Sequence, residues 1–340
     1  MTIIQLKPHS TINFECFTER EFPLLLHEMK TSETGRPYLL LFLVILIWGV
    51  NWIVGRCLSS PVLFGYVHIT GVLLGFLRYV MGAVTMILIL LFQKEHLSQT
   101  CSQMKPYATI LGISILASSL FVLSANQSQA YVSSGTSSII VNLCPALVLI
   151  YGIVFLEENL TIQKTIGFTL GFLGGLLFLY NSLKSNTGSH GDLGILLSSI
   201  AMISWAGYTI TLHYLEGANR AAVLSIQLTV SSVLIVPFLG IYMTTSPLEF
   251  VVDIWSILGI LFCGVVSSGI AYLLYFKTIE AIGAPKSASF LFLIPFVCLL
   301  GDVMLDELPS PITLIGGVVA ILGVALIKRD SRSHSGKSSA

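Results

Sequence analysis

The 340-residue sequence contains few charged residues: seventeen basic and seventeen acidic side chains make up only 10% of the chain. A soluble domain of average composition carries about 25% charged residues, so this chain has too few to cover a water-soluble fold. Apolar residues make up 54%, and the mean hydropathy is +0.88. The zero net charge also argues against a nucleic-acid partner, because binding to phosphates depends on an excess of basic side chains. We therefore expect a protein of the lipid bilayer with no nucleic-acid partner.

The sequence also lacks the clusters that enzyme and metal sites need. Its six cysteines are scattered without paired spacing, so they predict neither a disulfide framework nor a metal site. The seven histidines fall mainly in tails and loops, and the sequence contains no Gly-x-Ser-x-Gly. We therefore expect no enzyme activity, no catalytic residue, no bound metal and no cofactor.

Long apolar segments are abundant instead. A helix needs about 20 mostly apolar residues to cross the roughly 30 Å of bilayer hydrocarbon. The sequence contains ten such segments, at about 38–56, 71–92, 107–127, 134–156, 162–181, 193–213, 220–242, 255–276, 286–305 and 312–328. It therefore predicts an all-α integral membrane protein with ten transmembrane helices.

The basic residues predict an orientation, because Lys and Arg that flank short loops stay on the cytoplasmic side. With the N-terminus inside, Arg56 and Lys184 fall outside, Arg78 falls within the second span, and all the other basic residues fall inside. This distribution predicts a multi-pass protein of the inner (plasma) membrane with both termini cytoplasmic. Residues 1–37 then form a polar N-terminal tail, and residues 329–340 form a basic, Ser-rich tail.

Two stretches of the sequence resemble each other: CPALVLIYGIVFLEENLT at 144–161 and IPFVCLLGDVMLDELPS at 294–310. Pro145 matches Pro295 at an offset of 150, and Glu158 matches Glu307 at 149. The match divides the chain into residues 38–181 (spans 1–5) and 193–328 (spans 6–10). Because five is odd, the second half enters the membrane from the opposite side. This predicts two inverted five-helix repeats, with a substrate site between them near the midplane.

At these stretches the chain resembles the drug/metabolite transporter superfamily, EamA-type family. The resemblance rests on the Pro-then-Leu-x-Glu pattern of the fourth span in each half, on Trp-x-x-Asn in span 1 and on GFLRYVMG at 75–82. It covers about residues 38–328, although DELPSP at 306–311 departs from the family's usual turn. The resemblance implies a secondary-type transporter that moves a small metabolite, such as an amino acid, a nucleoside-like or a drug-like compound, by alternating access as an exporter or facilitator. A channel or a signalling scaffold without a transport cycle is the alternative.

The signature residues of each repeat have predicted physical roles. A proline within a span removes a backbone donor and bends the helix, so Pro145 and Pro295 are predicted helix kinks that shape a cavity wall. Acids at the rim of the spans either cap the next helix or form a gate, and they are Glu157, Glu158, Asp306 and Glu307. Asp302, the one plausible acid within a span, falls toward its outer end, which disfavours tight proton coupling.

Polar and aromatic side chains at mid-depth are the predicted substrate-binding residues, since buried polar groups in hydrocarbon face a cavity or each other. They are Trp48, Asn51, Arg78, Asn142, Trp205, Tyr208, Tyr272, Tyr275, Ser289 and Phe292. Two interpretations of Arg78 are open: its side chain extends outward to the membrane surface, or it holds a substrate carboxylate or phosphate with its planar fork. For the aromatic residues the alternative is ordinary packing or an interfacial belt, above all for Trp52 and Trp255.

Small residues recur on the fifth span at Gly167, Gly171 and Gly175, a spacing that allows close helix approach in lipid. We interpret this face as packing within the repeat, and a homodimer face is the alternative. The expected partners are therefore a small-molecule substrate, the lipid bilayer and, on that alternative, a second copy of the chain.

Overall fold

The structure is a computed structural model of the chain. It describes residues 35–61, 63–93, 105–155, 161–185, 191–215 and 218–304, together with scattered residues of 311–326. Its elements are α1 (Arg36–Ser59), α2 (Gly71–Phe92), η1 (Lys105–Tyr107), α4 (Ala108–Ser128), α5 (Ser134–Val141), α6 (Cys144–Phe155), α7 (Ile162–Ser185), α8 (Gly191–Tyr214), α9 (Arg220–Thr245), α10 (Ile254–Leu261), η2 (Phe262–Ile270), α11 (Ala271–Ile282), α12 (Ala284–Ser289), η3 (Phe290–Leu293) and α13 (Ile294–Met304). Apart from the first residue of α1, they all lie in the unit Pro37–Ala340.

Apolar helices dominate the residues that the structure describes. Eight helical segments there are long and apolar enough to cross a membrane, from Arg36–Ser59 to Lys286–Met304. Helix α7 has 24 residues, and Thr165–Gly174 is the apolar segment of it that the structure describes in full. Most of the tenth predicted span, 312–328, lies outside the described residues. The prediction of a helical, multi-pass membrane protein is confirmed, and the number ten stays a prediction.

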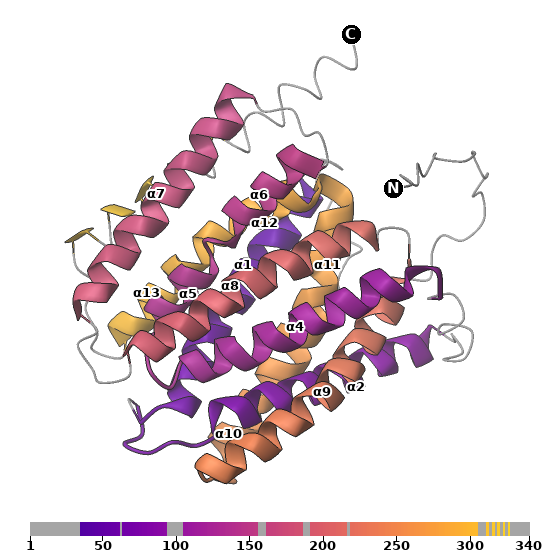
Figure 1. Cartoon of the computed structure of the whole chain (residues 1–340), viewed down its shortest axis with the longest axis vertical. Coiled ribbons are helices and arrows are strands. Elements are labelled where there is room, and N and C mark those ends of the chain that lie inside the picture. The colour runs from indigo at the N-terminus through magenta and orange to yellow at the C-terminus, as the bar shows by residue number, and fades with distance from the viewer. Residues whose placement is uncertain are drawn as a thin grey trace, which may run out of the picture. The chain divides into compact units, whose positions relative to one another are not determined.

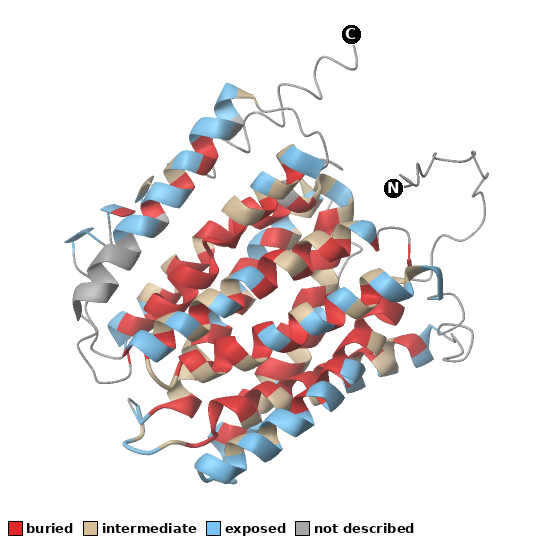
Figure 2. Cartoon of the chain, viewed as in Figure 1, coloured by how far each residue is buried: buried red, intermediate tan, exposed pale blue. Residues whose placement is uncertain are grey.

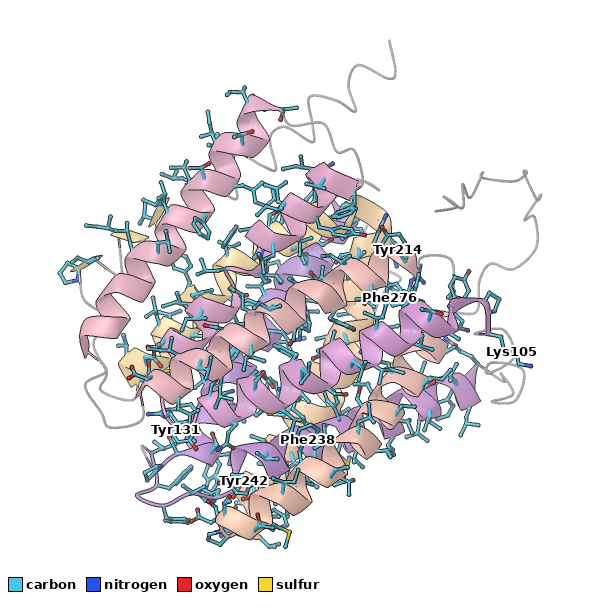
Figure 3. The ribbon with its side chains drawn as sticks, viewed as in Figure 1. Lys105, Tyr131, Tyr214, Phe238, Tyr242 and Phe276 are labelled. Carbon is cyan, nitrogen blue, oxygen red and sulfur yellow. The ribbon has the colours of Figure 1, made fainter. Side chains whose placement is uncertain are left out.

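The pattern of burial fits a lipid environment. Buried residues lie mainly between neighbouring helices, and exposed residues lie on the outer sides (Figure 2). Large apolar side chains are exposed there, including Phe42, Leu116 and Ile203 with exposed fractions of 54, 58 and 61%. Phe238 on α9 is another exposed aromatic side chain (Figure 3). An apolar surface of this extent is unfavourable in water and marks a membrane contact.

Helices from the two halves of the sequence pack in pairs. Helix α4 lies along α8, and α2 lies along α9 (Figure 1). One member of each pair comes from residues 38–181 and the other from residues 193–328. Both halves also contribute to the largest cluster of buried apolar side chains, which extends from Leu41 on α1 to Cys298 on α13. The packed core is therefore shared between the halves.

The glycine face of α7 packs against the second half of the sequence. A Cβ on Gly171 would overlap the ring of Phe292, and a Cβ on Gly323 would overlap the main chain of Gly167 and Gly171. Glycine is required because ring and backbone approach α7 too closely for any side chain. The predicted packing of this face within the first repeat is therefore wrong at Gly167 and Gly171, where it joins the two halves.

The fourth and ninth spans are both broken, in each case just before a proline. Helix α5 ends at Val141 and α6 begins at Cys144, so Pro145 is the second residue of the new segment. In the ninth span the 3-10 segment η3 separates α12 from α13, and Pro295 is the second residue of α13. Proline is tolerated in the first turn of a helix because the N–H that it lacks would have no partner there. The two breaks thus place matching prolines at matching positions.

The α1–α2 loop is attached to the α9–α10 loop. Ile69 and Phe250 form an isolated antiparallel bridge. The N–H of Thr70 donates to the Glu249 carbonyl at 3.0 Å, and the N–H of Glu249 donates to the Thr70 hydroxyl at 2.8 Å. The two loops therefore lie at the same end of the helices, which agrees with the predicted order of spans.

Asp253 begins α10 beside this contact. Its carboxylate accepts the Ser256 N–H at 2.8 Å as the N-cap of the helix, and its other oxygen lies 3.2 Å from Nδ1 of the fully buried His68. The Ser256 N–H, with smaller contributions from the Ser256 hydroxyl and His68, lowers the pKa of the Asp253 carboxyl. The ionised carboxylate therefore stabilises the start of α10 and the contact between the loops.

Candidate functional site: a buried polar cavity

A cavity lies among helices of both halves, between α1, α2, α4, α5, α8, α11 and α13. Twelve residues line it: Trp48, Asn51, Trp52, Arg78, Phe121, Ala125, Gln129, Val141, Asn142, Trp205, Tyr272 and Ile294. Six of the ten predicted substrate-binding residues are among them, namely Trp48, Asn51, Arg78, Asn142, Trp205 and Tyr272. All six are more than nine-tenths buried. The structure thus brings together residues that are up to 224 positions apart in the sequence.

The cavity is narrow in this conformation. The space between its lining atoms amounts to about 430 Å³, including the part that is open to solvent. Its open interior has a volume of about 30 Å³, and a single water needs at least about 10–15 Å³. The cavity therefore has room for a few waters and must widen before a metabolite can enter.

Arg78 on α2 points into the protein. Its side chain is 4% exposed, and its guanidinium donates through Nε to the Ser268 hydroxyl at 2.9 Å and through Nη2 to the Ser267 hydroxyl at 3.4 Å. Both partners are neutral, so no carboxylate among the described residues compensates the charge. The placement favours the interpretation in which the guanidinium faces the cavity over the one in which it extends to the membrane surface.

A π-helical segment, η2, positions Arg78 and Trp48. It carries Ser267 and Ser268, and the Ser268 hydroxyl donates to the Cys263 carbonyl five residues earlier at 2.9 Å. The Trp48 indole N–H donates to the Ser267 carbonyl at 3.2 Å. Gly264 has no room for a Cβ against α2, so the two backbones lie close together. π-helical turns are rare overall but occur often at functional sites, and no pattern in the sequence predicts this one.

Aromatic rings close one wall of the cavity. The Trp48 ring centroid lies 5.1 Å from that of Trp205, 5.7 Å from that of Tyr272 and 5.0 Å from that of Tyr275. Tyr208 is fully buried, with its centroid 5.8 Å from that of Tyr272. Edge-to-face contacts at such distances are favourable. The predicted residues Tyr208 and Tyr275 therefore support the wall from behind and do not line the cavity.

Two other predicted residues lie away from the cavity. The Ser289 hydroxyl donates to the Lys286 carbonyl of its own helix at 2.7 Å. Phe292 packs against Gly171 of α7, because the glycine leaves space there for the ring. The structure therefore does not place these two side chains with the six predicted residues that line the cavity. The predicted rim acids lie outside the described residues, and they are Glu157, Glu158, Asp306 and Glu307.

The cavity also contains residues that the sequence analysis does not predict. Trp52, expected in packing or an interfacial belt, is 5% exposed and lines the cavity one turn from Trp48, a spacing that indicates a shared face. Gln129, at the C-cap of α4, also lines the cavity. The feature of the sequence that could have indicated it is a polar amide side chain at the end of an apolar span. The remaining lining residues are Phe121, Ala125, Val141 and Ile294, whose apolar types do not distinguish them from ordinary core.

Asp302 is the only carboxylate that is buried in the described spans, with an exposed fraction of 5%. It accepts hydrogen bonds from the Ser134 hydroxyl and, at 3.0 Å, from the Gly135 N–H. These groups begin α5, where unpaired N–H groups favour a negative charge. Asp302 therefore joins α13 to α5, whose C-terminal end supplies Asn142 to the cavity.

A polar cavity inside apolar, membrane-length helices defines the class of a membrane transport protein. The chain belongs to the EamA-like transporter family, whose model matches residues 35–180 and again residues 192–329. The resemblance inferred from the sequence is thus confirmed. Membership of this family and the names of the relatives indicate a transporter rather than an enzyme.

Several relatives carry transporter names. "Uncharacterized transporter YvbV" of Bacillus subtilis is 25% identical over 90% of this chain and 96% of its own length. An "Uncharacterized transporter" of Archaeoglobus fulgidus is 27% identical over 66% of this chain and 79% of its own. A "Probable terminal-alkyne amino-acid exporter" of Streptantibioticus cattleyicolor is 22% identical over 60% and 67%. A solved crystal structure, 16% identical, has the same fold with a TM-score of 0.67 over 87% of this chain and 99% of the other.

Proposed function

We propose that the protein is a secondary-type transporter that carries a small metabolite with an acidic group by alternating access, as an exporter or facilitator. The observation that carries this proposal is Arg78, a buried cation in the cavity whose described partners are neutral hydroxyls. A carboxylate or phosphate can bind a guanidinium through two parallel hydrogen bonds. The S. cattleyicolor relative is named as an exporter of an amino acid, and an amino acid carries such a carboxylate.

The architecture that we propose has ten transmembrane helices in two inverted repeats, residues 38–181 and 193–328, between tails at 1–37 and 329–340. The double match of the family model and the matching breaks before Pro145 and Pro295 support it. Alternating access then consists of a movement of one half against the other around the cavity. Because Gly167 and Gly171 already pack against the second half, the single chain is the transport unit in this proposal.

Transport in reconstituted liposomes tests the function. Vesicles that contain the protein and unlabelled amino acid should take up labelled amino acid transiently above its equilibrium level, and the flux should saturate. A channel would show neither counterflow nor saturation of this kind, and a scaffold would move nothing. Comparison of the metabolites that cells retain with and without the protein would supply further solutes for the same assay.

Single-cysteine labelling tests the proposed orientation, with both termini in the cytoplasm and the chain in the inner (plasma) membrane. In a background without native cysteines, Thr187→Cys should react with a membrane-impermeant thiol reagent in intact cells. Gln99→Cys and Ser335→Cys should react only after the cells are permeabilised. The reverse pattern would overturn the orientation.

A further inference from the structure

Two carboxamide oxygens in the cavity wall lack a hydrogen-bond partner among the residues that the structure describes. They are Oδ1 of Asn51 on α1 and Oε1 of Gln129 at the end of α4. The side chains are 6% and 1% exposed. A buried acceptor without a donor destabilises a fold, so two such acceptors on residues that line a cavity call for a donor that the described residues do not supply.

The two oxygens approach the same turn of α1. The Gln129 amide nitrogen donates to the Ala125 carbonyl at 3.2 Å, which fixes the orientation of the amide and directs its oxygen away from α4. A Cβ on Gly55 would overlap this oxygen first, so Oε1 lies directly against α1. Asn51 precedes Gly55 by four residues, which is one turn along the same face of the helix. The side chains of Asn51 and Gln129 therefore lie along the same stretch of α1.

We propose that Asn51 Oδ1 and Gln129 Oε1 form an ammonium subsite, which together with Arg78 selects zwitterionic substrates that carry a primary amine and a carboxylate. This inference rests on the proposed function. An ammonium group has three N–H donors and so can satisfy both acceptors at once. The rings of Trp48 and Trp52, which also line the cavity from α1, favour a cation further. The apolar remainder of the cavity suits an apolar side chain on the substrate.

Neutral amides suit this role better than carboxylates would. A carboxylate at either position would attract the Arg78 guanidinium, and the anion anchor would then be occupied within the protein. Arg56 also donates to the main-chain carbonyl of Gln129, and its positive charge opposes an ammonium.

Binding of three matched probes tests the subsite: phenylalanine, 3-phenylpropanoate, which lacks the amine, and phenethylamine, which lacks the carboxylate. The purified, full-length protein reports binding by its intrinsic fluorescence, since Trp48, Trp52 and Trp205 line the cavity. The wild-type protein should bind phenylalanine about tenfold or more tightly than 3-phenylpropanoate, because the amine satisfies two buried acceptors. Phenethylamine should bind weakly, because it has no group for Arg78.

Two near-isosteric variants test whether Asn51 and Gln129 cause the preference for phenylalanine. Gln129→Met and Asn51→Leu should each reduce the preference for phenylalanine over 3-phenylpropanoate about tenfold, mainly through weaker binding of phenylalanine. Gln127→Met is the matched control: Gln127 also lies on α4 with a buried, unpaired Oε1, but it does not line the cavity. It should leave the preference unchanged.

The outcomes separate the subsite from the proposed function. If the preference persists in both variants, or if wild-type protein prefers 3-phenylpropanoate, a water fills the position and the ammonium subsite is wrong, while Arg78-dependent transport stands. If the probes do not bind although an anionic solute still shows counterflow, the subsite is likewise wrong. If no solute shows saturable counterflow, the proposed function fails and the subsite fails with it.

Discussion

The two halves of the chain contribute different chemistry to one cavity. Asn51, Arg78, Gln129 and Asn142 all come from the first half, whereas the second half lines the cavity with Trp205, Tyr272 and Ile294. The same family model matches both halves, and both have a span that breaks before a proline. The similarity of the two halves therefore predicts that their backbones match. It does not predict which half supplies the polar residues of the cavity.

Matched positions show the same division. Asn142 and Phe292 each lie three residues before the proline of their span, but Asn142 lines the cavity and Phe292 packs against α7. In the matching motifs WGVN and WAGY, both tryptophans reach the cavity, whereas Asn51 lines it and Tyr208 is buried behind the wall. In our proposal the first half provides recognition and the second provides an apolar surface that closes over the substrate.

The largest effect is expected at Arg78, the charged group of the first half. Arg78→Gln should reduce kcat/KM for a carboxylate substrate about 100-fold, because two charge-assisted hydrogen bonds are lost. Arg78→Lys should reduce it less, because an ammonium keeps the charge but cannot form the planar fork. Initial rates of uptake into liposomes, normalised to folded protein, measure both variants.

A second arginine provides the control for this prediction. Arg220 on α9 forms an ion pair with Glu280 away from the cavity lining. Arg220→Gln should leave kcat/KM within about twofold, since this partly exposed ion pair does not touch the cavity. Near-normal affinity of Arg78→Lys for a carboxylate substrate, or a transported compound without an acidic group, would remove Arg78 from the proposed role.

The next prediction tests the matched residues Asn142 and Phe292 directly. Asn142→Leu should reduce transport about tenfold or more at unchanged folding, because it fills the cavity and removes a polar group from its wall. Phe292→Leu should leave substrate affinity unchanged and should destabilise the protein by about 1 kcal/mol, because it leaves unfilled space at α7. Dissociation constants and thermal unfolding in detergent measure the two effects. Normal transport by Asn142→Leu would show that Asn142 is a packing residue and would remove the asymmetry at this pair.

The sequence predicts much of the backbone, because an apolar run of membrane length is a local property. The second predicted span, 71–92, coincides with α2, and Ser133, which precedes the fourth span, caps α5. The prolines indicate where the fourth and ninth spans break. The π-helical form of η2 leaves no comparable signal, and neither does the close approach of Gly264 to α2, because both involve segments that are far apart in the sequence.

The cavity could be predicted only in part. Polar residues such as Arg78 and Asn142 are conspicuous in apolar spans, and both line the cavity. Trp52 and Phe292 were ambiguous because an aromatic residue suits a cavity, a lipid interface or a core equally well. Which of these environments it occupies depends on contacts with distant segments, as the Phe292 contact with Gly171 illustrates. Sequence spacing along one helix does not contain that information.

A smaller effect is expected at Ser268 of the second half, because its hydroxyl orients the Arg78 guanidinium of the first half. Ser268→Ala removes the acceptor that holds Arg78 Nε at 2.9 Å. The guanidinium would remain but would lose its orientation, so substrate affinity should fall about fivefold, the usual magnitude for one neutral hydrogen-bond partner. Ser225→Ala is the matched control, because that buried hydroxyl bonds only to the Ala222 carbonyl of its own helix. Equal affinities for the two variants would show that η2 does not position Arg78.

The smallest effect concerns the loop contact between the halves, where Asp253 caps α10 and lies beside His68. The pKa of Asp253 is lowered below its ordinary value of about 3.9. Its stabilising contribution is therefore complete above the unfolded-state pKa and is lost as the pH falls through the lower folded-state pKa. Asp253→Asn keeps a good N-cap but does not titrate.

Thermal unfolding in detergent between pH 6 and pH 3 measures this contribution. The melting temperatures of the wild-type protein and of Asp253→Asn are compared, because the two proteins share every other acidic group. The melting temperature of the wild-type protein should fall more steeply than that of Asp253→Asn below about pH 4, by no more than about 1–2 °C, because the carboxylate is partly exposed and screened. At pH 6 the two proteins should differ little, since Asn and Asp cap helices almost equally well. Parallel curves throughout would mean that the charge of Asp253 does not contribute to the contact, and that the hydrogen bonds at Thr70 and the bridge at Ile69 hold the loops without it. The contact between the halves would then be independent of pH, and any acid sensitivity of transport would have to arise elsewhere, with Asp302 at the start of α5 as the next residue to substitute.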